Sequence, residues 1–356
     1  MVFKTTNFFE SLGVASIERI HSQMISWIFN NYKEFKEKTF CAFLEYFGIN
    51  INLIKEVVTC TEYKSIDILL LINNTALVVE NKIKSSEHSN QLLRYKEIIA
   101  NDFKKNNVKY VYLTLGENSN NNDWKNVSYS DLLLALNVLK TNNNKIKVFV
   151  DEYKDSIKRL SDVVKDFLEN HTQYTNVFTD GSLTKYDKRT KLVSYSENAR
   201  YVGENQLETI FQKLFLEKLI KALNLKQQTF IFETRGNAAF RFVFRKIKFG
   251  DKHFNIDFQF QNGTIKVPLG YWGIDKEVDY DMTKPDDIPL KLKKKYFKFM
   301  REYYDSQVRR NNSKSKAYIS VSKQYDSWGI KDFKTIVSDL KEEIEKIAKV
   351  VDKIEF

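Results

Sequence analysis

The chain has 356 residues, of which 42% are hydrophobic and 14% aromatic, and its formal net charge is +11. This length is sufficient for two hydrophobic cores, and the basic balance favours an anionic partner such as nucleic acid. The two cysteines, Cys41 and Cys60, have neither CxxC spacing nor nearby histidines, which excludes zinc fingers and indicates buried thiols in a reducing compartment. No run of 18 apolar residues and no signal-like stretch at Met1–Glu10 occurs, so we expect a cytoplasmic protein without a membrane partner.

The first part of the chain predicts helices followed by strands. Apolar residues at helical spacing indicate a helix over Glu10–Asn31, and a second helix over Phe40–Phe47 that ends at Gly48. Short runs rich in Ile, Leu and Val predict three strands over Ile54–Thr61, Ile66–Ile72 and Thr75–Ile83. The Asn73-Asn74 pair is typical of a hairpin, so these strands should form an antiparallel meander.

A helix and a strand complete this part. The helix runs from Gln91 through Ile99, with Ser85 or Ser86 as its N-cap, and the strand covers Val108–Leu115. The predicted order is therefore helix, three strands, helix, strand.

Charged residues lie at the ends of two neighbouring apolar strands. Asp67 starts one strand, Glu80 and Lys82 end the next, and the hairpin brings the two carboxylates close together. Side chains two apart share a face of a strand, so Glu80 and Lys82 point the same way. Two carboxylates can hold Mg²⁺ or Mn²⁺, and a lysine beside them can orient an attacking water. The pattern predicts a metal-dependent phosphodiesterase site, with a plain salt bridge at a strand end as the alternative.

These residues and the surrounding elements resemble the PD-(D/E)xK phosphodiesterase superfamily, and more closely its bacterial PD-(D/E)XK nuclease branch, found near restriction and phage-defence genes. The resemblance covers about the first 170 residues. Its pieces are Glu18–Ser22 with Trp27, Asp67, Glu80–Ile83, Gln91–Tyr95, Tyr112–Gly116, Trp124 with Val127–Asp131, and Val148–Tyr153. The family usually has a basic residue where Ser65 stands here, which puts one phosphate contact in doubt.

The resemblance implies the metal ligands. Asp67 and Glu80 should bind the ion, with the backbone carbonyl of Asn81 as a third oxygen, and Lys82 should lie by the attacking water. Glu18 resembles a helix acid that completes the metal shell in some members, and a solvated helix glutamate is the alternative.

Further residues can support this site. Gln91 and Tyr95 resemble an element that supports the active site or contacts substrate, and for Tyr95 a half-buried core tyrosine is the alternative. His21 and His88 have no partner at metal-ligand spacing, so we expect each to be an ordinary polar surface residue or a helix residue with satisfied hydrogen bonds.

The second half holds most of the basic excess. Its clusters are Lys185–Lys191, Arg241–Lys248, Lys291–Lys295 and Arg309–Lys316. They could neutralise phosphates of nucleic acid, or they could simply be solvated faces.

The second half also has its own predicted elements. They are a polar connection over Asn170–Ser196, a helix over Leu207–Leu223, strands over Thr229–Thr234, Ala239–Phe249, His253–Gln261 and Thr264–Leu269, and helices over Pro289–Ser306 and Ile330–Lys353. Phe240, Phe242 and Phe244 alternate with Arg241 and Arg245. This pattern fits an aromatic core stripe with solvated arginines, or a face of the sheet that contacts DNA.

The expected fold is α/β (α+β). A restriction-endonuclease-like αβββαβ core with a mixed sheet should form a nuclease domain over residues 1–170, and residues 171–200 should connect it to a C-terminal α+β domain over 201–356 that binds DNA or a partner.

The expected function is a Mg²⁺- or Mn²⁺-dependent deoxyribonuclease in bacterial phage defence or restriction, with RNA left open as substrate. A homodimer or a defence-system protein is a candidate partner. The alternative is a non-catalytic or partner-gated nucleic-acid-binding protein that retains the nuclease fold.

Overall fold

The computed structural model describes residues 7–84, 90–103, 107–116, 118–119, 121–178, 195–234, 236–249, 252–270, 288–303, 309–311, 318–325 and 328–354. The chain divides into two compact units. The first comprises Met1–Glu169 and Glu204–Phe211, and the second comprises Asn170–Gly203 and Gln212–Phe356.

The first unit is built on a five-stranded sheet of order β1-β2-β3-β4-β5. Its strands are β1 (Val57–Tyr63), β2 (Ile66–Ile72), β3 (Thr75–Lys82), β4 (Asn107–Thr114) and β5 (Trp124–Ser128). β1, β2 and β3 pair antiparallel, whereas β4 and β5 are added in parallel. The sheet is therefore mixed, as expected, and the predicted meander is confirmed.

The turn between β2 and β3 fixes the register of this hairpin. Asn73 has φ 51°, in the left-handed region that asparagine tolerates well, and Ile72 pairs with Thr75. The Asn73 side chain also accepts hydrogen bonds from the backbone N–H groups of Lys55 and Glu56, at 2.8 and 3.3 Å. One asparagine thus forms the turn and ties down the entry to β1.

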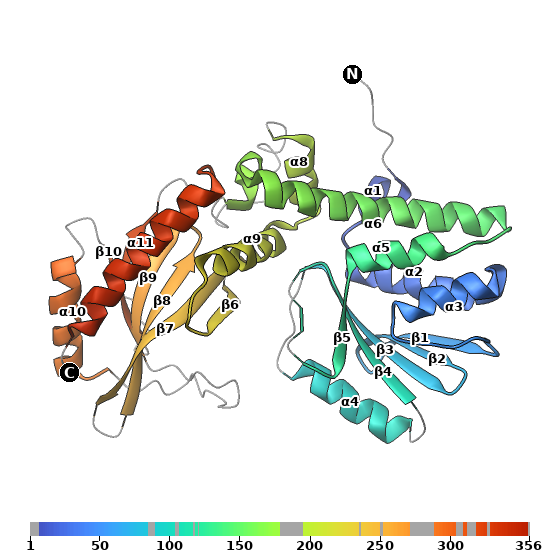
Figure 1. The fold of residues 1–356 in the computed structure, drawn as a ribbon, viewed down its shortest axis with the longest axis horizontal. Helices are drawn as coiled ribbons and strands as arrows, with labels where there is room; N and C mark the ends of the chain where they lie inside the picture. Colours follow the sequence, from blue (N-terminus) through green and yellow to red (C-terminus); the bar gives the residue numbers. More distant parts are fainter. Residues whose placement is uncertain are drawn as a thin grey trace. The chain divides into compact units, whose positions relative to one another are not determined.

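Helices lie on both faces of this sheet (Figure 1). α4 (Gln91–Asp102) covers one face, and the opposite face carries α2 (Glu18–Asn30), α3 (Glu37–Glu45) and α5 (Tyr129–Val138). On the α4 side the buried core joins Leu69 and Val78 of the sheet to Leu92 and Ile99 of the helix. Each strand therefore turns alternate side chains toward two different layers.

Several elements differ from the predictions. The single helix expected over Glu10–Asn31 is instead two helices, α1 (Phe8–Ser11) and α2, because Gly13 between them adopts φ +68°, which breaks the helical path. β5, α5 and the 27-residue α6 (Asn144–Asn170) were not predicted. Ser85 and Ser86, the predicted caps of α4, lie outside the described residues.

The second unit contains a six-stranded antiparallel sheet of order β10-β11-β9-β8-β7-β6. Its strands are β6 (Thr229–Thr234), β7 (Asn237–Phe249), β8 (Lys252–Gln261), β9 (Thr264–Gly270), β10 (Arg309–Asn311) and β11 (Tyr318–Gln324). The four-strand meander from β6 to β9 agrees with prediction, whereas β10 and β11 were missed.

The second unit also contains α10 (Leu290–Tyr303), α11 (Phe333–Asp352) and most of α8 (Glu197–Glu204) and α9 (Glu208–Leu223), whereas the last residue of α8 and the first turn of α9 belong to the first unit. The start of α8 and the short 3-10 turns His171–Gln173 and Thr175–Phe178 fall within residues 171–200, which were predicted to connect the two domains. The basic cluster Lys185–Lys191 and residues 312–316 lie outside the described part of the chain.

The aromatic stripe of β7 belongs to the core. Phe240 and Phe242 are fully buried, and the Phe242 ring stacks on Phe258 with centroids 5.1 Å apart. A β-bulge between Val243 and Arg245 shifts the alternation, so that Arg245 reaches the C-terminus of α11 and donates to the carbonyls of Val351 and Ile354 at 3.0 and 2.8 Å. Arg245 therefore caps a helix instead of extending a face of the sheet.

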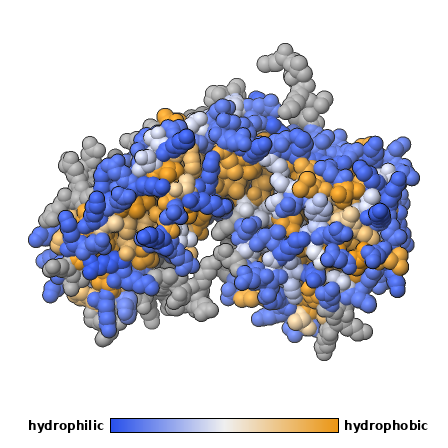
Figure 2. Space-filling model, viewed as in Figure 1, coloured by the Kyte–Doolittle hydropathy of each residue, from blue (hydrophilic) through white to orange (hydrophobic). Residues whose placement is uncertain are grey.

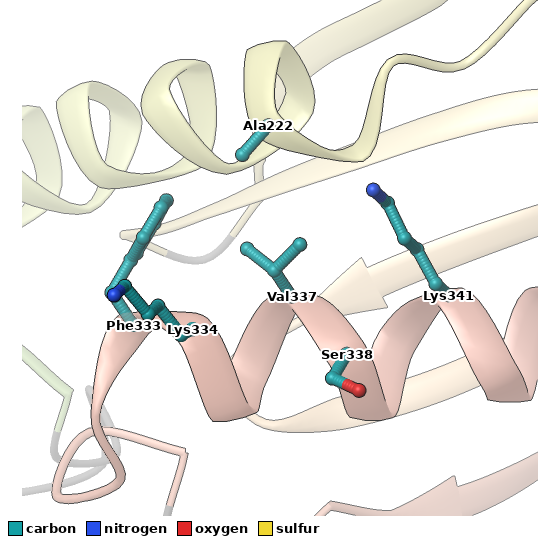
Figure 3. A pocket seen from close by; sticks show the side chains of 6 residues that line it. All are labelled: Ala222, Phe333, Lys334, Val337, Ser338 and Lys341. Carbon is teal, nitrogen blue, oxygen red and sulfur yellow. The ribbon is translucent and has the colours of Figure 1, made fainter.

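A shallow hollow lies between α9 and α11 (Figure 3). Phe333, Val337 and Lys341 of α11 point toward Ala222 of α9. Hydrophobic residues also appear between hydrophilic ones on the surface in this region (Figure 2). Apolar groups and lysines of the second unit line this hollow. Asp67, Glu80 and Lys82 lie in the first unit. Among the described residues, no helix is long and apolar enough to cross a membrane.

Candidate active site

The hairpin of β2 and β3 brings Asp67 and Glu80 together. Ile68 pairs with Val79 in an antiparallel register, so Asp67, one residue before Ile68, lies beside Glu80, one residue after Val79. The backbone N–H of Asn81 donates to Asp67 Oδ2 at 2.7 Å. Asp67 is thereby held against the backbone of the strand that carries Glu80.

Lys82 and Glu80 form an ion pair on the α4 side of the sheet. Lys82 Nζ lies 2.6 Å from Glu80 Oε1, and the two residues are 8% and 1% exposed. Burial alone would lower the pKa of Lys82, but the Glu80 and Asp67 carboxylates outweigh it and raise the pKa. The ammonium therefore stays charged beside two carboxyl groups.

The two carboxyl groups have too little positive charge around them. Burial, followed by the charge of Asp67, raises the pKa of Glu80 to about 8. Burial likewise raises the pKa of Asp67. Glu80 Oε2 is buried, and no described residue donates a hydrogen bond to it. Two adjacent carboxylates resist joint ionisation unless more positive charge is added.

Gln91 and Tyr95 support this pair from α4. Gln91 Nε2 donates to Glu80 Oε1 at 2.8 Å and to the Tyr95 hydroxyl at 2.6 Å. The Tyr95 hydroxyl in turn donates to the backbone carbonyl of Ser65. Tyr95 is fully buried, so it is a core residue that also links α4 to the start of β2. Both residues lie on one face of α4, four positions apart, and Gln91 contacts Glu80.

The Glu18 carboxylate accepts hydrogen bonds from the backbone just after β3. Its Oε1 accepts hydrogen bonds from the N–H groups of Ile83 and Lys84, at 2.7 and 2.9 Å. Its charge still reaches Asp67 and Lys82. Glu18 therefore holds the chain that leaves β3, close to the carboxylates.

Asn81 points its side chain to the opposite face. Its Nδ2 donates to the Glu18 carbonyl at 2.9 Å and to Ser22 Oγ at 3.2 Å, and its Oδ1 accepts from the Tyr129 hydroxyl at 2.7 Å. Asn81 is fully buried. The residue between Glu80 and Lys82 is thus fixed to both α2 and α5.

Ser22 and Tyr129 are partners that the sequence did not identify. Both lie in segments that carried the family resemblance, Glu18–Ser22 and Val127–Asp131, and this was the only signal for them. Tyr129 is held at the start of α5 by a capping box in which Ser128 and Asp131 exchange hydrogen bonds.

His21 is a buried histidine with polar partners. Its Nε2 lies 3.0 Å from the Ala15 carbonyl, which can only accept, so Nε2 carries the proton, and Nδ1 then accepts from the Tyr153 hydroxyl at 3.2 Å. Burial lowers its pKa to about 4. His21 is therefore a neutral structural residue, whereas His88 lies outside the described residues.

The donor set suits a hard divalent cation. Within the described part of the chain, no three His, Cys, Asp or Glu side chains form a metal cluster. Asp67 and Glu80 nevertheless provide two carboxyl groups with raised pKa values and one buried oxygen to which no described residue donates a hydrogen bond. Mg²⁺ is commonly held by one or two carboxylates, with water and substrate completing its shell. The residues present therefore fit such an ion.

A family model described as the PD-(D/E)XK nuclease superfamily matches residues 6–201, which is more than half of the chain. No curated protein and no solved structure matches it.

Proposed function

Because this chain belongs to the PD-(D/E)XK nuclease superfamily, we propose that it is a metal-dependent deoxyribonuclease that hydrolyses DNA phosphodiester bonds. The observation that carries the proposal is the Lys82 ammonium, 2.6 Å from the Glu80 carboxylate, beside Asp67. Family membership supports a nuclease that acts on nucleic acid. The choice of DNA as the substrate and the requirement for a metal ion are parts of our proposal.

We assign the metal to Asp67 and Glu80, with the backbone carbonyl of Asn81 as a further oxygen ligand. Mg²⁺ or Mn²⁺ bound there would neutralise charge on the scissile phosphate and lower the pKa of the attacking water. Glu18, whose Oε1 accepts two backbone N–H groups, would act on the ion through its charge or through its second oxygen.

The chain's own residues prepare the site for substrate. Lys82 is charged and compact, so it can orient the attacking water or stabilise negative charge that develops on the phosphate. Gln91 holds Glu80 Oε1 in position, and Tyr95 holds Gln91. Orientation by such partners is what keeps a carboxylate aimed at its ligand.

Plasmid nicking tests the proposal. Supercoiled plasmid is incubated with the full chain in Mg²⁺, in Mn²⁺ and in EDTA, and nicked and linear products are measured. We expect cleavage by the wild type with metal only, and a loss of about 10²-fold or more in Asp67→Ala and Lys82→Ala. Retained activity in either variant would remove the assigned site.

A matched lysine controls for charge and folding. Lys64 lies two residues before the start of β2. Its side chain is 54% exposed, and its Nζ lies 2.6 Å from Asp102 Oδ2. Lys64→Ala should cleave like the wild type. A loss equal to that of Lys82→Ala would point to general charge effects instead of catalysis.

One observation favours a second candidate function, a nucleic-acid-binding protein that is non-catalytic or waits for a partner. One carboxylate oxygen of Glu18 accepts hydrogen bonds from the backbone N–H groups of Ile83 and Lys84. In this candidate function Glu18 does not bind the ion, and only the Asp67 and Glu80 carboxylates remain at the proposed site. This candidate predicts metal-independent DNA binding and no cleavage with either metal.

We further propose that the activity serves phage defence or restriction in the cytoplasm, as the sequence resemblance suggests. Both cysteines are free thiols, in keeping with a reducing compartment. Cys41 is buried as predicted, whereas the prediction of a buried Cys60 was wrong, because its side chain is exposed on β1. Cutting both strands of a duplex would need two sites, for which a homodimer is the simplest arrangement.

A further inference from the structure

The sheet of the second unit has a polar face opposite its phenylalanine core. Residues directly opposite on adjacent strands share a face, and the pairs Phe230 with Arg241, Arg241 with Gln259, and Gln259 with Lys266 trace one face across β6, β7, β8 and β9. Beyond the bulge, Lys246 pairs with Asn255 and Lys248 with His253, on the same face. We call this surface the basic face; its members used below are Phe230, Phe232, Arg241, Lys246, Lys248, Asp257, Gln259 and Lys266.

The basic face is cationic and accessible. Lys246 and Lys248 are exposed, and Arg241, Gln259 and Lys266 are half-exposed. Four cationic side chains on one sheet face create a positive potential that attracts phosphate. The face therefore suits a polyanion.

Two aromatic side chains border these cations. Phe230 and Phe232 of β6 are half-exposed, and the Arg241 guanidinium lies 5.6 Å from the centroid of the Phe232 ring. Phenylalanines beside arginine on an exposed sheet are the arrangement on which unpaired bases stack. Paired bases inside a duplex offer no such free ring face.

Asp257 supplies an acceptor without a donor. It lies on this face opposite Val243, is 1% exposed, and among the described residues no group donates to its Oδ1. Burial raises its pKa to about 7, and the charge of Arg241 opposes that shift. A buried acceptor left unpaired costs free energy, which a ligand bearing an amino group would recover. Arg241 and Gln259, the long side chains near it, can change rotamer to admit such a group.

We propose that the basic face binds single-stranded nucleic acid, with phosphates at its cations, bases against its two phenylalanines and a base amino group at Asp257. This binding surface is separate from the proposed catalytic residues. Only one part of the proposal rests on the nuclease function, namely that the bound single strand is a substrate for cutting. Cytosine is the sharpest probe because its N4 amino group donates to carboxylates.

Fluorescence anisotropy tests this surface in EDTA, with the full chain carrying Lys82→Ala so that no cutting occurs. The probe is a labelled oligo(dC) of about 20 nucleotides, compared with a duplex of equal length and an oligo(C) RNA. Lys246→Glu combined with Lys248→Glu should weaken oligo(dC) binding by roughly tenfold or more, and lower the slope of log affinity against log salt by about 1.4. Phe232→Ala should weaken binding by about tenfold without changing that slope.

A matched charge reversal on a helix is the control. Lys341→Glu with Lys349→Glu changes two exposed lysines of α11 and should leave binding unchanged. Equal weakening by both double variants, or tighter binding of duplex than of single strand, would overturn the proposal. Binding of DNA and RNA to similar extents supports the face as a general single-strand surface, and thermal melting followed by circular dichroism shows that each variant is folded.

Asp257→Asn tests the acceptor by the direction of its effect. If Asp257 receives a base amino group, oligo(dC) binding weakens by several-fold; if it makes no contact, loss of its negative charge leaves binding equal or tighter and removes this residue from the surface. A different result would reject the nuclease proposal. In that result the wild-type chain does not cut plasmid with either metal, although single strands still bind to the basic face.

Discussion

The Tyr129 hydroxyl donates a 2.7 Å hydrogen bond to the side-chain oxygen of Asn81, the residue that lies between Glu80 and Lys82. Through this bond α5 holds the back of the strand whose front carries the proposed catalytic residues. The two faces of β3 are therefore linked through Asn81, so substitutions at Tyr129 should also affect the position of Glu80 and Lys82.

Tyr129→Phe should lower the free energy of unfolding by about 1–3 kcal/mol, because Asn81 Oδ1 would be left buried without its donor. Urea denaturation followed by circular dichroism measures this. The control is Tyr110→Phe, whose ring packs on Trp124 at 5.1 Å and whose change should stay within about 0.5 kcal/mol. Equal stability of both variants would mean that the Tyr129 bond contributes nothing.

Gln91→Ala should raise the Mg²⁺ concentration needed for half-maximal plasmid nicking by about 10–100-fold, because Glu80 Oε1 loses a donor that orients it. Leu93→Ala, at a 48% exposed position of the same helix, should leave that concentration unchanged. An unchanged Mg²⁺ requirement in Gln91→Ala would show that Lys82 alone is enough to hold Glu80.

His21 should make the protein less stable in mild acid. Its pKa is about 4 in the folded chain against 6.5 for a solvent-exposed histidine, so the unfolded chain binds more protons between these values. Its contribution is complete above pH 6.5 and is lost as the pH falls toward 4, by up to about 3 kcal/mol. In His21→Gln this part of the pH dependence of urea unfolding should disappear; an unchanged profile would show that another group causes it.

Asp257 should act in the opposite direction. Its pKa is raised from 3.8 to about 7, so the folded chain holds its proton longer than the unfolded chain, and stability falls as the pH rises through this range. Asp257→Asn should therefore stabilise the protein at pH 8 by on the order of 2–4 kcal/mol and have little effect at pH 4. Stabilisation of equal size at both pH values would argue against an ionised, buried Asp257.

Much of the proposed site could be predicted from the sequence, because it is local. Asp67 and Glu80 lie on two strands joined by one tight turn, and strand alternation places Lys82 beside Glu80. The placement of Gln91 and Tyr95 on one helical face likewise needs only the helical period. Such periodicities and turn preferences act within a few residues, so no knowledge of distant partners is required.

The breaks in regular structure were harder to predict. Gly13 divides the first helix, and the bulge beside Arg245 turns that arginine to the C-terminus of α11. Either sequence pattern would also fit an uninterrupted element, because an isolated glycine is tolerated in a helical pattern and the helix end that Arg245 contacts lies 106 positions away.

The hairpin, the order of the core elements and the meeting of the two carboxylates follow from local patterns, since turn chemistry and apolar alternation depend on adjacent residues. The hydrogen-bond partners of the polar atoms around them depend instead on the completed fold. Asn81 is paired with a tyrosine 48 positions away, and Glu18 accepts from N–H groups 65 and 66 positions away. Buried polar groups take the partner that the completed fold brings near, and that choice is invisible in a local pattern.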